Sequence, residues 1–509
     1  MHQRRKPLGK SAQPELVHNS AAGHTAAGQQ LATPETRLPS PCPTRVRERS
    51  PTLALVAGPS AKRTSPHEGS CIRSCPSRRS GALSTARHMK TNDWIRHSHF
   101  AALDWACDHH DVAIVDRTGA LIAEFRFAHT AEGWAEFSAR MKPYTGAPLA
   151  LETSSGPAVD QLLQRGWTVY PVNPKAAARY RDRKVPSGTK SDAHDAWSLA
   201  DALRTDGHGW RPLRPQDEAT ARLRVLCRDE IALIEQRTAL VNQLIACLRE
   251  YYPVALELFD DWTRPHAWAL VQQFPTPQKL QEAGKRRWEK FLHTHRLWRK
   301  GTAPARLQLM AQAATLNASP AVLEAKTLLA LALVKILETL QTQLDEYRRR
   351  IRETFAQHPD HEVFGSLPGA GEKLSPRLLG EIGSVREVYP DADALCCQSG
   401  VSPVRVQSGQ LDMARIRWAC NTALRHTVHL WADCSRKRSA WAQAYYKGKR
   451  QEGHTHASAL RCLGKRWLKI LWRLWQDRQR YSETYHQQRQ QKHGSWVSSA
   501  LTAAQPAGL

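Results

Sequence analysis

The chain has 509 residues, too many for one ordinary hydrophobic core, so two or three domains are expected. It carries 73 Lys and Arg against 47 Asp and Glu, and this formal charge of +26 favours a polyanionic partner, most commonly nucleic acid, over a merely solvated basic surface. The sequence contains no run of about 18 apolar residues, so we expect no membrane span, and no secretory signal is evident. Eleven cysteines without paired metal-ligand spacing fit free thiols in a reducing cytoplasm.

Residues 1–88 are rich in Pro, Ser, Arg, Gly and Ala and show no lasting period, so we expect a disordered basic tail. They hold 14 Lys and Arg against 4 Glu, and the remainder of the chain is also strongly basic. Met89 directly precedes the first patterned segment, which suggests that the tail is upstream sequence translated from an early start codon. The alternative is a basic arm that binds nucleic acid.

From His99 onward, strand-like runs separated by turn signals predict a three-stranded antiparallel meander, after which helices and strands alternate. Strands followed by strand and helix alternation describe a mixed α/β sheet. An acid at the end of the first strand and another at the end of the fourth is the arrangement of the ribonuclease H fold. The expected strands are 100–104, 111–115, 121–127, 148–152 and 168–172, and the expected helices are 133–141 and 157–165.

Four acids form the candidate metal site. Asp104 and Glu152 each follow an apolar strand, and Asp192 and Asp195 share one side of a helix because residues three apart are neighbours there. Each acid taken alone could have a purely structural role instead of binding metal, for example as a turn residue or as an acid at a helix N-terminus. Together they predict a pocket for hard divalent cations, Mg²⁺ or Mn²⁺. Two such ions about 4 Å apart would polarise a phosphodiester and stabilise charge on the attacking and leaving oxygens.

Two long helical patterns follow, over residues 217–252 and 320–357, and both carry apolar residues seven apart. These seams predict either an antiparallel hairpin or a dimerising coiled coil. Residues 260–318 between them contain four prolines and basic clusters, and we expect a small helical insert there. The first helix contributes Leu226, Leu233 and Leu240 with Ile234, Val241 and Leu248; the second contributes Leu323, Ala330, Leu337, Leu344 and Ile351 with Leu333, Leu340 and Tyr347.

Three basic or glycine-containing features could meet nucleic-acid phosphates. Lys184 and Lys190 flank the acids, although either could be an ordinary solvated lysine. A Gly-x-Gly turn at 369–371 could aim backbone N–H groups at a phosphate, but alone it is a weak signal. In the helix at 461–480, tryptophans among cations could stack on bases, whereas packing of an amphipathic helix on its own domain is the commoner role. The aromatic residues of that helix are Trp467, Trp472 and Trp475.

Several blocks resemble the DEDD domain of the insertion sequence 110 family of transposases, and a second set resembles the C-terminal domain of that family. The first set is Leu103-Asp104, Leu151-Glu152-Thr153-Ser154, Val172-Asn173-Pro174 and Lys190-Ser191-Asp192-Ala193-His194-Asp195-Ala196. The second set is Leu367-Pro368-Gly369-Ala370-Gly371, Glu381-Ile382-Gly383, Ser399-Gly400-Val401-Ser402-Pro403 and Gln407-Ser408-Gly409. The two domains in this order are more specific than either half.

The resemblance implies a DNA recombinase with a split active site. Carried over by position, the metal ligands are Asp104, Glu152, Asp192 and Asp195, and Ser408 attacks the DNA phosphate to give a covalent phosphoserine intermediate. A serine hydroxyl is a weak nucleophile and needs a base or a metal to activate it. The resemblance further implies DNA substrates, a guide RNA recognised largely by shape, a homodimer or homotetramer, and a bacterial, nucleoid-associated location in the cytoplasm.

Some features keep other interpretations open. Ser399 and Ser402 are competing serines outside the matching Ser-Gly position, and without the resemblance Ser408 would read as a turn residue. Cys420 stands where the family has glycine, and Gln410 replaces its common lysine, so this copy could be inactive. The alternatives to a transposase are a structure-specific, Holliday-junction type metal-dependent nuclease that uses water, and a non-enzymatic nucleic-acid-binding remnant.

The expected organisation is therefore a ribonuclease H-like (RuvC-like) α/β domain, long coiled-coil helices, and a mainly α-helical C-terminal domain. The boundaries are residues 1–88 for the tail, 98–215 for the DEDD domain, 216–358 for the helices with their insert, 359–485 for the serine-containing domain and 486–509 for a second disordered tail.

Overall fold

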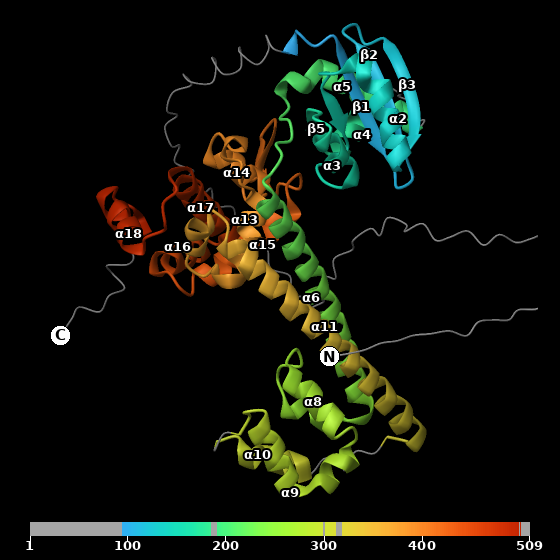
Figure 1. The fold of residues 1–509 in the computed structure, drawn as a ribbon. Coiled ribbons are helices and arrows are strands. Elements are labelled where there is room, and N and C mark those ends of the chain that lie inside the picture. Colours follow the sequence, from blue (N-terminus) through green and yellow to red (C-terminus); the bar gives the residue numbers. More distant parts are fainter. Residues whose placement is uncertain (1–93, 185–190, 299–300, 312–317, 498, 500–509) are drawn as a thin grey trace, which may run out of the picture. The chain divides into compact units, whose positions relative to one another are not determined.

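The computed structural model describes residues 94–184, 191–298, 301–311, 318–497 and 499 (Figure 1). The expected tail at residues 1–88 lies outside this part of the chain. Predicted Lys190 is also outside it.

The first domain contains a five-stranded mixed sheet with the strand order β3-β2-β1-β4-β5 (Figure 1). β1 pairs antiparallel with β2, and β2 pairs antiparallel with β3, so the predicted meander is confirmed. β4 and β5 extend the sheet in parallel on the other side of β1. This is the topology of the ribonuclease H fold, as expected. The strands are β1 (His99–Trp105), β2 (His109–Asp116), β3 (Leu121–Ala128), β4 (Leu149–Leu151) and β5 (Val169–Pro171).

Helices cover both faces of this sheet. On one face, α2 (Ala131–Met141) and α3 (Pro157–Gln164) pack against Leu103 and its neighbours of the same strand parity. On the other face, α5 (Asp192–Asp206) packs against the alternate residues, among them Phe100 and Ala102. Because side chains alternate along a strand, the buried apolar residues 100–103 of β1 contribute to the cores on both faces of the sheet. α4 (Pro174–Lys184), which we did not predict, packs beside α5.

The two long helical patterns form α6 (Glu218–Tyr251) and α11 (Pro320–Ala356), which pack against each other. The pairs run in opposite directions: Cys247 lies beside Lys326, Arg237 bonds Gln341, and Glu230 bonds Arg348. Of the two predicted outcomes, the antiparallel hairpin is therefore present within one chain. Of the predicted seam residues, the hairpin buries Val241, Leu248, Ala330, Leu333, Leu337, Leu344 and Ile351.

By length and composition, α6 is the one helix among the described residues that could cross a membrane. Core helices of other proteins meet the same test. Here α6 supplies Leu244 and Leu248 to a core shared with Leu333 and Leu337 of α11. We therefore assign α6 to the helical hairpin.

Helices lie between α6 and α11, in the segment where we expected a small helical insert. Three of its four described helices begin at prolines. Proline suits the first turn of a helix because the N–H group that it lacks would have no partner within the helix there. Trp268 and Trp288 are fully buried in its core together with residues at the end of α6. The helices are α7 (Pro253–Leu258), α8 (Pro265–Gln273), α9 (Pro277–Thr294) and α10 (Ala303–Ala311).

The C-terminal domain is mainly helical, as predicted, and its core is rich in tryptophan. Trp467 and Trp475 of α17 are fully buried and donate hydrogen bonds to Ser435 and Asp360, so packing rather than base stacking is their role. The elements are α12 (His361–Gly365), α13 (Gly371–Ile382), α14 (Ala392–Gln398), β6 (Val404–Ser408), β7 (Leu411–Arg415), α15 (Thr422–Ser435), α16 (Ala440–Gln451), α17 (His456–Asp477) and α18 (Glu483–Lys492).

Two details of this domain differ from the expectations. The Gly-x-Gly turn serves packing, since a Cβ on Gly369 would lie 2.6 Å from the backbone of Cys434. A phosphate is not needed to explain that glycine. The ordered region also extends past the expected boundary at residue 486, because α18 continues to Lys492 and Val497 is buried in the domain core.

Candidate active site

The register of β1 and β4 brings two of the predicted acids to neighbouring positions. Leu103 of β1 pairs with Leu151 of β4, and these strands are parallel. The next residue on each strand is an acid, Asp104 on β1 and Glu152 directly after β4. Both are partly buried. By alternation, Asp104 and Glu152 share the sheet face that α5 covers.

The other two predicted acids lie in the first turn of α5. Ser191 caps this helix by accepting a hydrogen bond from the backbone N–H of His194, which fixes where the helix begins. Leu199 and Leu203 anchor α5 to the sheet face shared with Asp104. Asp192 and Asp195 therefore belong to the same face of the domain as the strand acids.

Asp111 of β2 is a further acid on this face that we did not assign to the site. It lies directly opposite Asp104 in the antiparallel pair and is only 6% exposed. Potential ligand atoms of His109, Asp111 and Asp192 all lie within 4.8 Å of one another. Among the described residues this is the group that meets that spacing, and it includes only Asp192 of the four predicted ligands.

We call the group formed by Asp104, Asp111, Glu152, Asp192 and Asp195 the acidic face. Two arginines form ion pairs with its carboxylates. Arg126 forms two hydrogen bonds to Asp111, at 3.0 and 2.9 Å, and its guanidinium is also 3.7 Å from Asp192. Arg181 donates from one nitrogen to both oxygens of Asp195 at 2.9 Å. These hydrogen bonds raise the pKa of both arginines, and the nearby charge of Glu152 adds to the effect at Arg181. Arg181 thus interacts electrostatically with two of the predicted metal ligands, Asp195 and Glu152.

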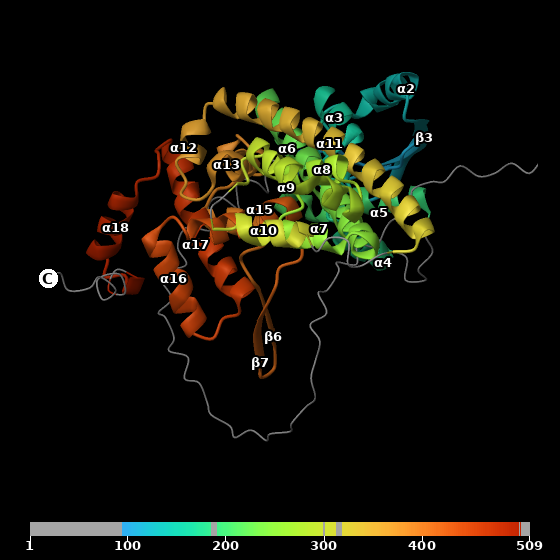
Figure 2. The same cartoon turned by 90° about the horizontal axis from the view of Figure 1, so that it is seen from below.

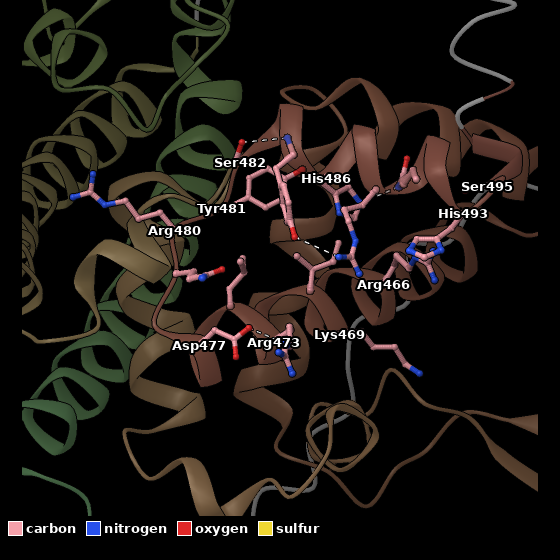
Figure 3. Close-up of a pocket in the computed structure, with 16 residues that line it drawn as sticks. Arg466, Lys469, Arg473, Asp477, Arg480, Tyr481, Ser482, His486, His493 and Ser495 are labelled. Atoms are coloured by element: carbon pink, nitrogen blue, oxygen red, sulfur yellow. Dashed lines mark hydrogen bonds and ion pairs between the residues drawn. The ribbon is translucent and has the colours of Figure 1, made fainter. Parts of the chain in front are cut away.

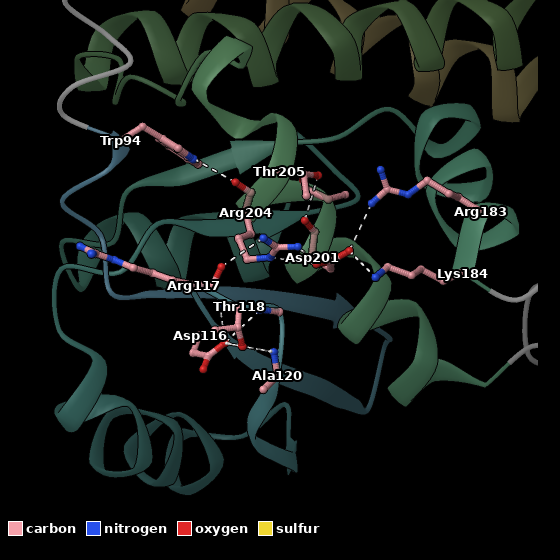
Figure 4. A network of polar contacts seen from close by, with 12 residues as sticks. Trp94, Asp116, Arg117, Thr118, Ala120, Arg183, Lys184, Asp201, Arg204 and Thr205 are labelled. Carbon is pink, nitrogen blue, oxygen red and sulfur yellow. Dashed lines mark hydrogen bonds and ion pairs between the residues drawn. The ribbon is translucent and has the colours of Figure 1, made fainter.

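A separate ionic network fixes the same helix further along (Figure 4). Fully buried Asp201 binds Arg183, Lys184 and Arg204. Burial alone would raise the pKa of Asp201, but hydrogen bonds from Lys184 and Arg204 outweigh it and lower the pKa. Lys184, a candidate phosphate contact in the sequence, instead joins α4 to α5 through a 2.7 Å ion pair.

The candidate nucleophile Ser408 lies at the end of β6, beside the turn of a β-hairpin. It pairs with Leu411 across a two-residue connection in which Gly409 has a φ of +54°. Ser408 is exposed, whereas the competing Ser399 and Ser402 are 0% and 6% exposed. Figure 2 shows the hairpin projecting from the helices of its domain. Of these three serines, Ser408 is the one open to a macromolecular substrate.

The departure at Cys420 is accommodated by neighbouring residues. A Cβ on Gly400 would lie 2.7 Å from the Cys420 sulfur. Because glycine has no side chain, there is room for the thiol at this position. Asn421 then caps α15 and donates a 2.7 Å hydrogen bond to Glu381. Burial would raise the pKa of Glu381, but hydrogen bonds from Arg228 and Asn421 outweigh it and lower the pKa. The motif residue Glu381 therefore ties α13 to both α6 and α15.

Acids gathered on one face of a ribonuclease H-like sheet suit metal-assisted cleavage of phosphodiesters. Comparison with known proteins makes the class definite. The DEDD transposase domain matches residues 101–253, and the transposase domain of the IS116/IS110/IS902 family matches residues 361–447.

Full-length relatives extend the match. The chain is 35% identical over 400 residues to the mini-circle protein assigned as the transposase for IS117 of Streptomyces coelicolor, covering 75% of this chain and 95% of that protein. It is 33% identical to a protein assigned as transposase y4uE of Sinorhizobium fredii, over 52% of this chain and 74% of the relative. An insertion element IS116 protein of Streptomyces clavuligerus is 28% identical, over 58% and 73% respectively. The chain belongs to the IS110 family of transposases, and it is an enzyme that acts on DNA.

Proposed function

We propose that this transposase cuts and rejoins DNA through a covalent phosphoserine intermediate on Ser408, with divalent metal held by the acidic face of the ribonuclease H-like domain. The observation that carries the proposal is the contrast in exposure between Ser408 and the buried Ser399 and Ser402. A nucleophile for a DNA phosphate must be reachable by a duplex, and Ser408 meets this requirement.

The donor set of the acidic face fits a hard divalent cation. Asp104, Glu152, Asp192 and Asp195 offer carboxylate oxygens, which Mg²⁺ and Mn²⁺ prefer. Bound metal would act as a Lewis acid at the scissile phosphate. We propose those four acids as ligands and add Asp111, because it is opposite Asp104 and within 4.8 Å of a ligand atom of Asp192.

The proposed chemistry has two transfers. In the first, the Ser408 oxygen forms a bond to phosphorus, one DNA P–O bond breaks, and the leaving strand takes a proton as a free hydroxyl. In the second, a hydroxyl of another DNA strand attacks the phosphoserine, and Ser408 regains its proton as the new DNA bond forms. No external energy source is required, because each bond broken is matched by a bond of the same kind.

We further propose that a non-coding RNA guides the enzyme, that it works as a homodimer or homotetramer, and that it acts at the bacterial nucleoid in the cytoplasm. The support for guidance is the family, and the formal charge of +26 agrees with nucleic-acid partners without distinguishing RNA from DNA. RNA would then be recognised largely through its backbone and shape.

The experiment is a strand cleavage and joining assay with the full chain, Mg²⁺, element-end DNA, target DNA and RNA transcribed from the flanking DNA. Ser408→Ala should abolish both cleavage and joining, and Asp104→Asn should do the same. Ser402→Ala serves as the matched control and should stay active. If Ser408→Ala cleaves normally while Asp104→Asn does not, the enzyme is a metal-dependent nuclease that uses water.

A further inference from the structure

A large basic pocket lies between α17 and the segment that contains α18 (Figure 3). It encloses about 830 Å³, within the range of pockets that hold ligands of nucleotide size. Figure 3 shows Lys469, Arg473 and Asp477 of α17 on one side and Tyr481 and His486 opposite, with Arg466 of α17 close to His493. None of these residues belongs to the proposed active site.

The charge of the pocket is strongly positive. Five Lys and Arg residues line it, against the single acid Asp477. Three of the cations have carboxylate partners: Arg473 pairs with Asp477, while Lys469 and Arg480 pair with acids of other elements. Arg466 and Arg489 have no carboxylate within ion-pair distance in the described part of the chain, so their charges are available to an anionic ligand.

An aromatic ring accompanies these charges. Tyr485 lines the pocket and is 58% exposed, although its ring is large and largely apolar. The guanidinium of Arg489 lies 5.9 Å from the centre of that ring. Cations beside an accessible aromatic face are the combination that binds single-stranded nucleic acid, because the bases stack while the cations meet phosphates.

Gln490 adds an independent indication of a ligand. Its side chain lines the pocket and is only 5% exposed, with its amide nitrogen 2.9 Å from His486. The amide oxygen, Oε1, is buried and has no hydrogen-bond partner among the described residues. A buried acceptor without a donor destabilises the protein, and a base N–H or a ribose hydroxyl would satisfy it.

We propose that this pocket binds a nucleotide of a single-stranded nucleic-acid segment during the reaction. Tyr485 stacks on the base, Arg466 and Arg489 contact the flanking phosphates, and Gln490 Oε1 accepts a hydrogen bond from the base or the sugar. The inference rests on the proposed nucleic-acid function but not on Ser408. An acidic protein segment could match the charge, but it would not use the exposed ring and the buried acceptor together.

The test is fluorescence anisotropy of the full chain with labelled single-stranded RNA, single-stranded DNA of the same sequence, and the DNA duplex. Tyr485→Ala should weaken single-strand binding by about 5- to 100-fold, as expected for loss of one stacked base, while Tyr485→Phe should bind normally. Arg466→Ala/Arg489→Ala should lower the slope of log affinity against log salt by about 1.4, as expected for two lost phosphate contacts. A preference of the parent for RNA that Gln490→Leu removes would identify a ribose hydroxyl as the donor, and equal RNA and DNA binding would identify a base.

The matched control removes two arginines elsewhere. Arg286 and Arg287 of α9 are exposed and have no ion pair among the described residues, so Arg286→Ala/Arg287→Ala changes the net charge equally. An equal loss of affinity in this control would overturn the proposal, as would unchanged single-strand binding by Tyr485→Ala with an unchanged melting temperature. Ser408→Ala should bind single strands like the parent, so failure of the pocket and failure of the serine mechanism give different results.

Discussion

Asp104 and Asp111 lie directly opposite each other across the antiparallel pair of β1 and β2. Residues opposite each other in such a pair point to the same face of the sheet. The acidic face therefore contains a carboxylate beyond the four that the DEDD pattern supplies. Since Asp111 is 6% exposed and held by Arg126, it is built into the face rather than added at its rim.

Asp111→Asn should reduce the affinity for Mn²⁺ by about tenfold or more, because it removes the negative charge of one of the proposed ligands. Isothermal titration of the full chain with Mn²⁺ measures this. Asp160→Asn, on the exposed side of α3 in the same domain, controls for the loss of one negative charge. Equal affinity in the two variants would exclude Asp111 from the metal site.

Arg181 should stabilise the acidic face by compensating its negative charge when no metal is bound. Its ion pair holds Asp195, whose side chain is only 12% exposed, so Arg181→Met leaves a largely buried carboxylate uncompensated. The free energy of unfolding should fall by about 2 kcal/mol without divalent ions, and Mg²⁺ should restore part of it. Urea unfolding with and without Mg²⁺ checks this. Arg183→Met, which removes one of three cations from Asp201, should show no Mg²⁺-dependent recovery.

The glycines of the turn before α13 should differ in their tolerance of a side chain. Gly369 has a φ of +76° and approaches the backbone of Cys434, so Gly369→Ala should cost about 2–4 kcal/mol of stability. Gly371 has a φ of +54°, and a Cβ added there would meet nothing within 4 Å, so Gly371→Ala should cost only about 1 kcal/mol. Chemical denaturation compares them, and a larger loss at Gly371 would contradict this account of the turn.

His486 should make stability depend on pH. Burial, followed by the charge of Arg466, lowers the pKa of His486 from 6.5 to about 4. Above pH 6.5 the group is neutral in both states and has no effect. As pH falls from 6.5 to about 4, the unfolded state gains a proton that the folded state does not, so stability declines.

His486→Asn should remove this decline, with a gain over the parent of about 2 kcal/mol at pH 4 relative to pH 7 after allowance for partial solvent exposure. Urea unfolding at both pH values measures the difference. A parallel decline in the two proteins would show that other groups, not His486, set the acid response.

Much of the first domain could be predicted because its strands are marked by short apolar runs and turn residues that are visible in the local sequence. The expected strand at 100–104 became β1 (His99–Trp105), and the strand ends carried the acids. Asp111 was missed because residues 108–110 were read as a turn, whereas β2 already begins at His109. The alternation of β1 and β2 was the available signal, since a tight hairpin places Asp111 opposite Asp104.

Other features depend on tertiary contacts that the sequence does not display. The sequence of α4 is basic, and none of its described residues is buried. It therefore lacks the periodic apolar pattern from which a helix is predicted. The heptads of α6 and α11 were compatible with either a partner chain or a hairpin, and the pairing of Glu230 with Arg348 within one chain decides for the hairpin. The exposure that separates Ser408 from Ser399 and Ser402 likewise follows from how α14 packs, not from the local motif.

The most direct measurement is mass spectrometry of the covalent protein–DNA complex formed during strand joining in Mg²⁺. A nucleotide phosphate attached to Ser408 should remain after nuclease digestion, and Ser408→Ala should yield no adduct. Strand joining by Ser408→Ala, or an adduct on a different residue of the parent enzyme, would contradict the serine mechanism.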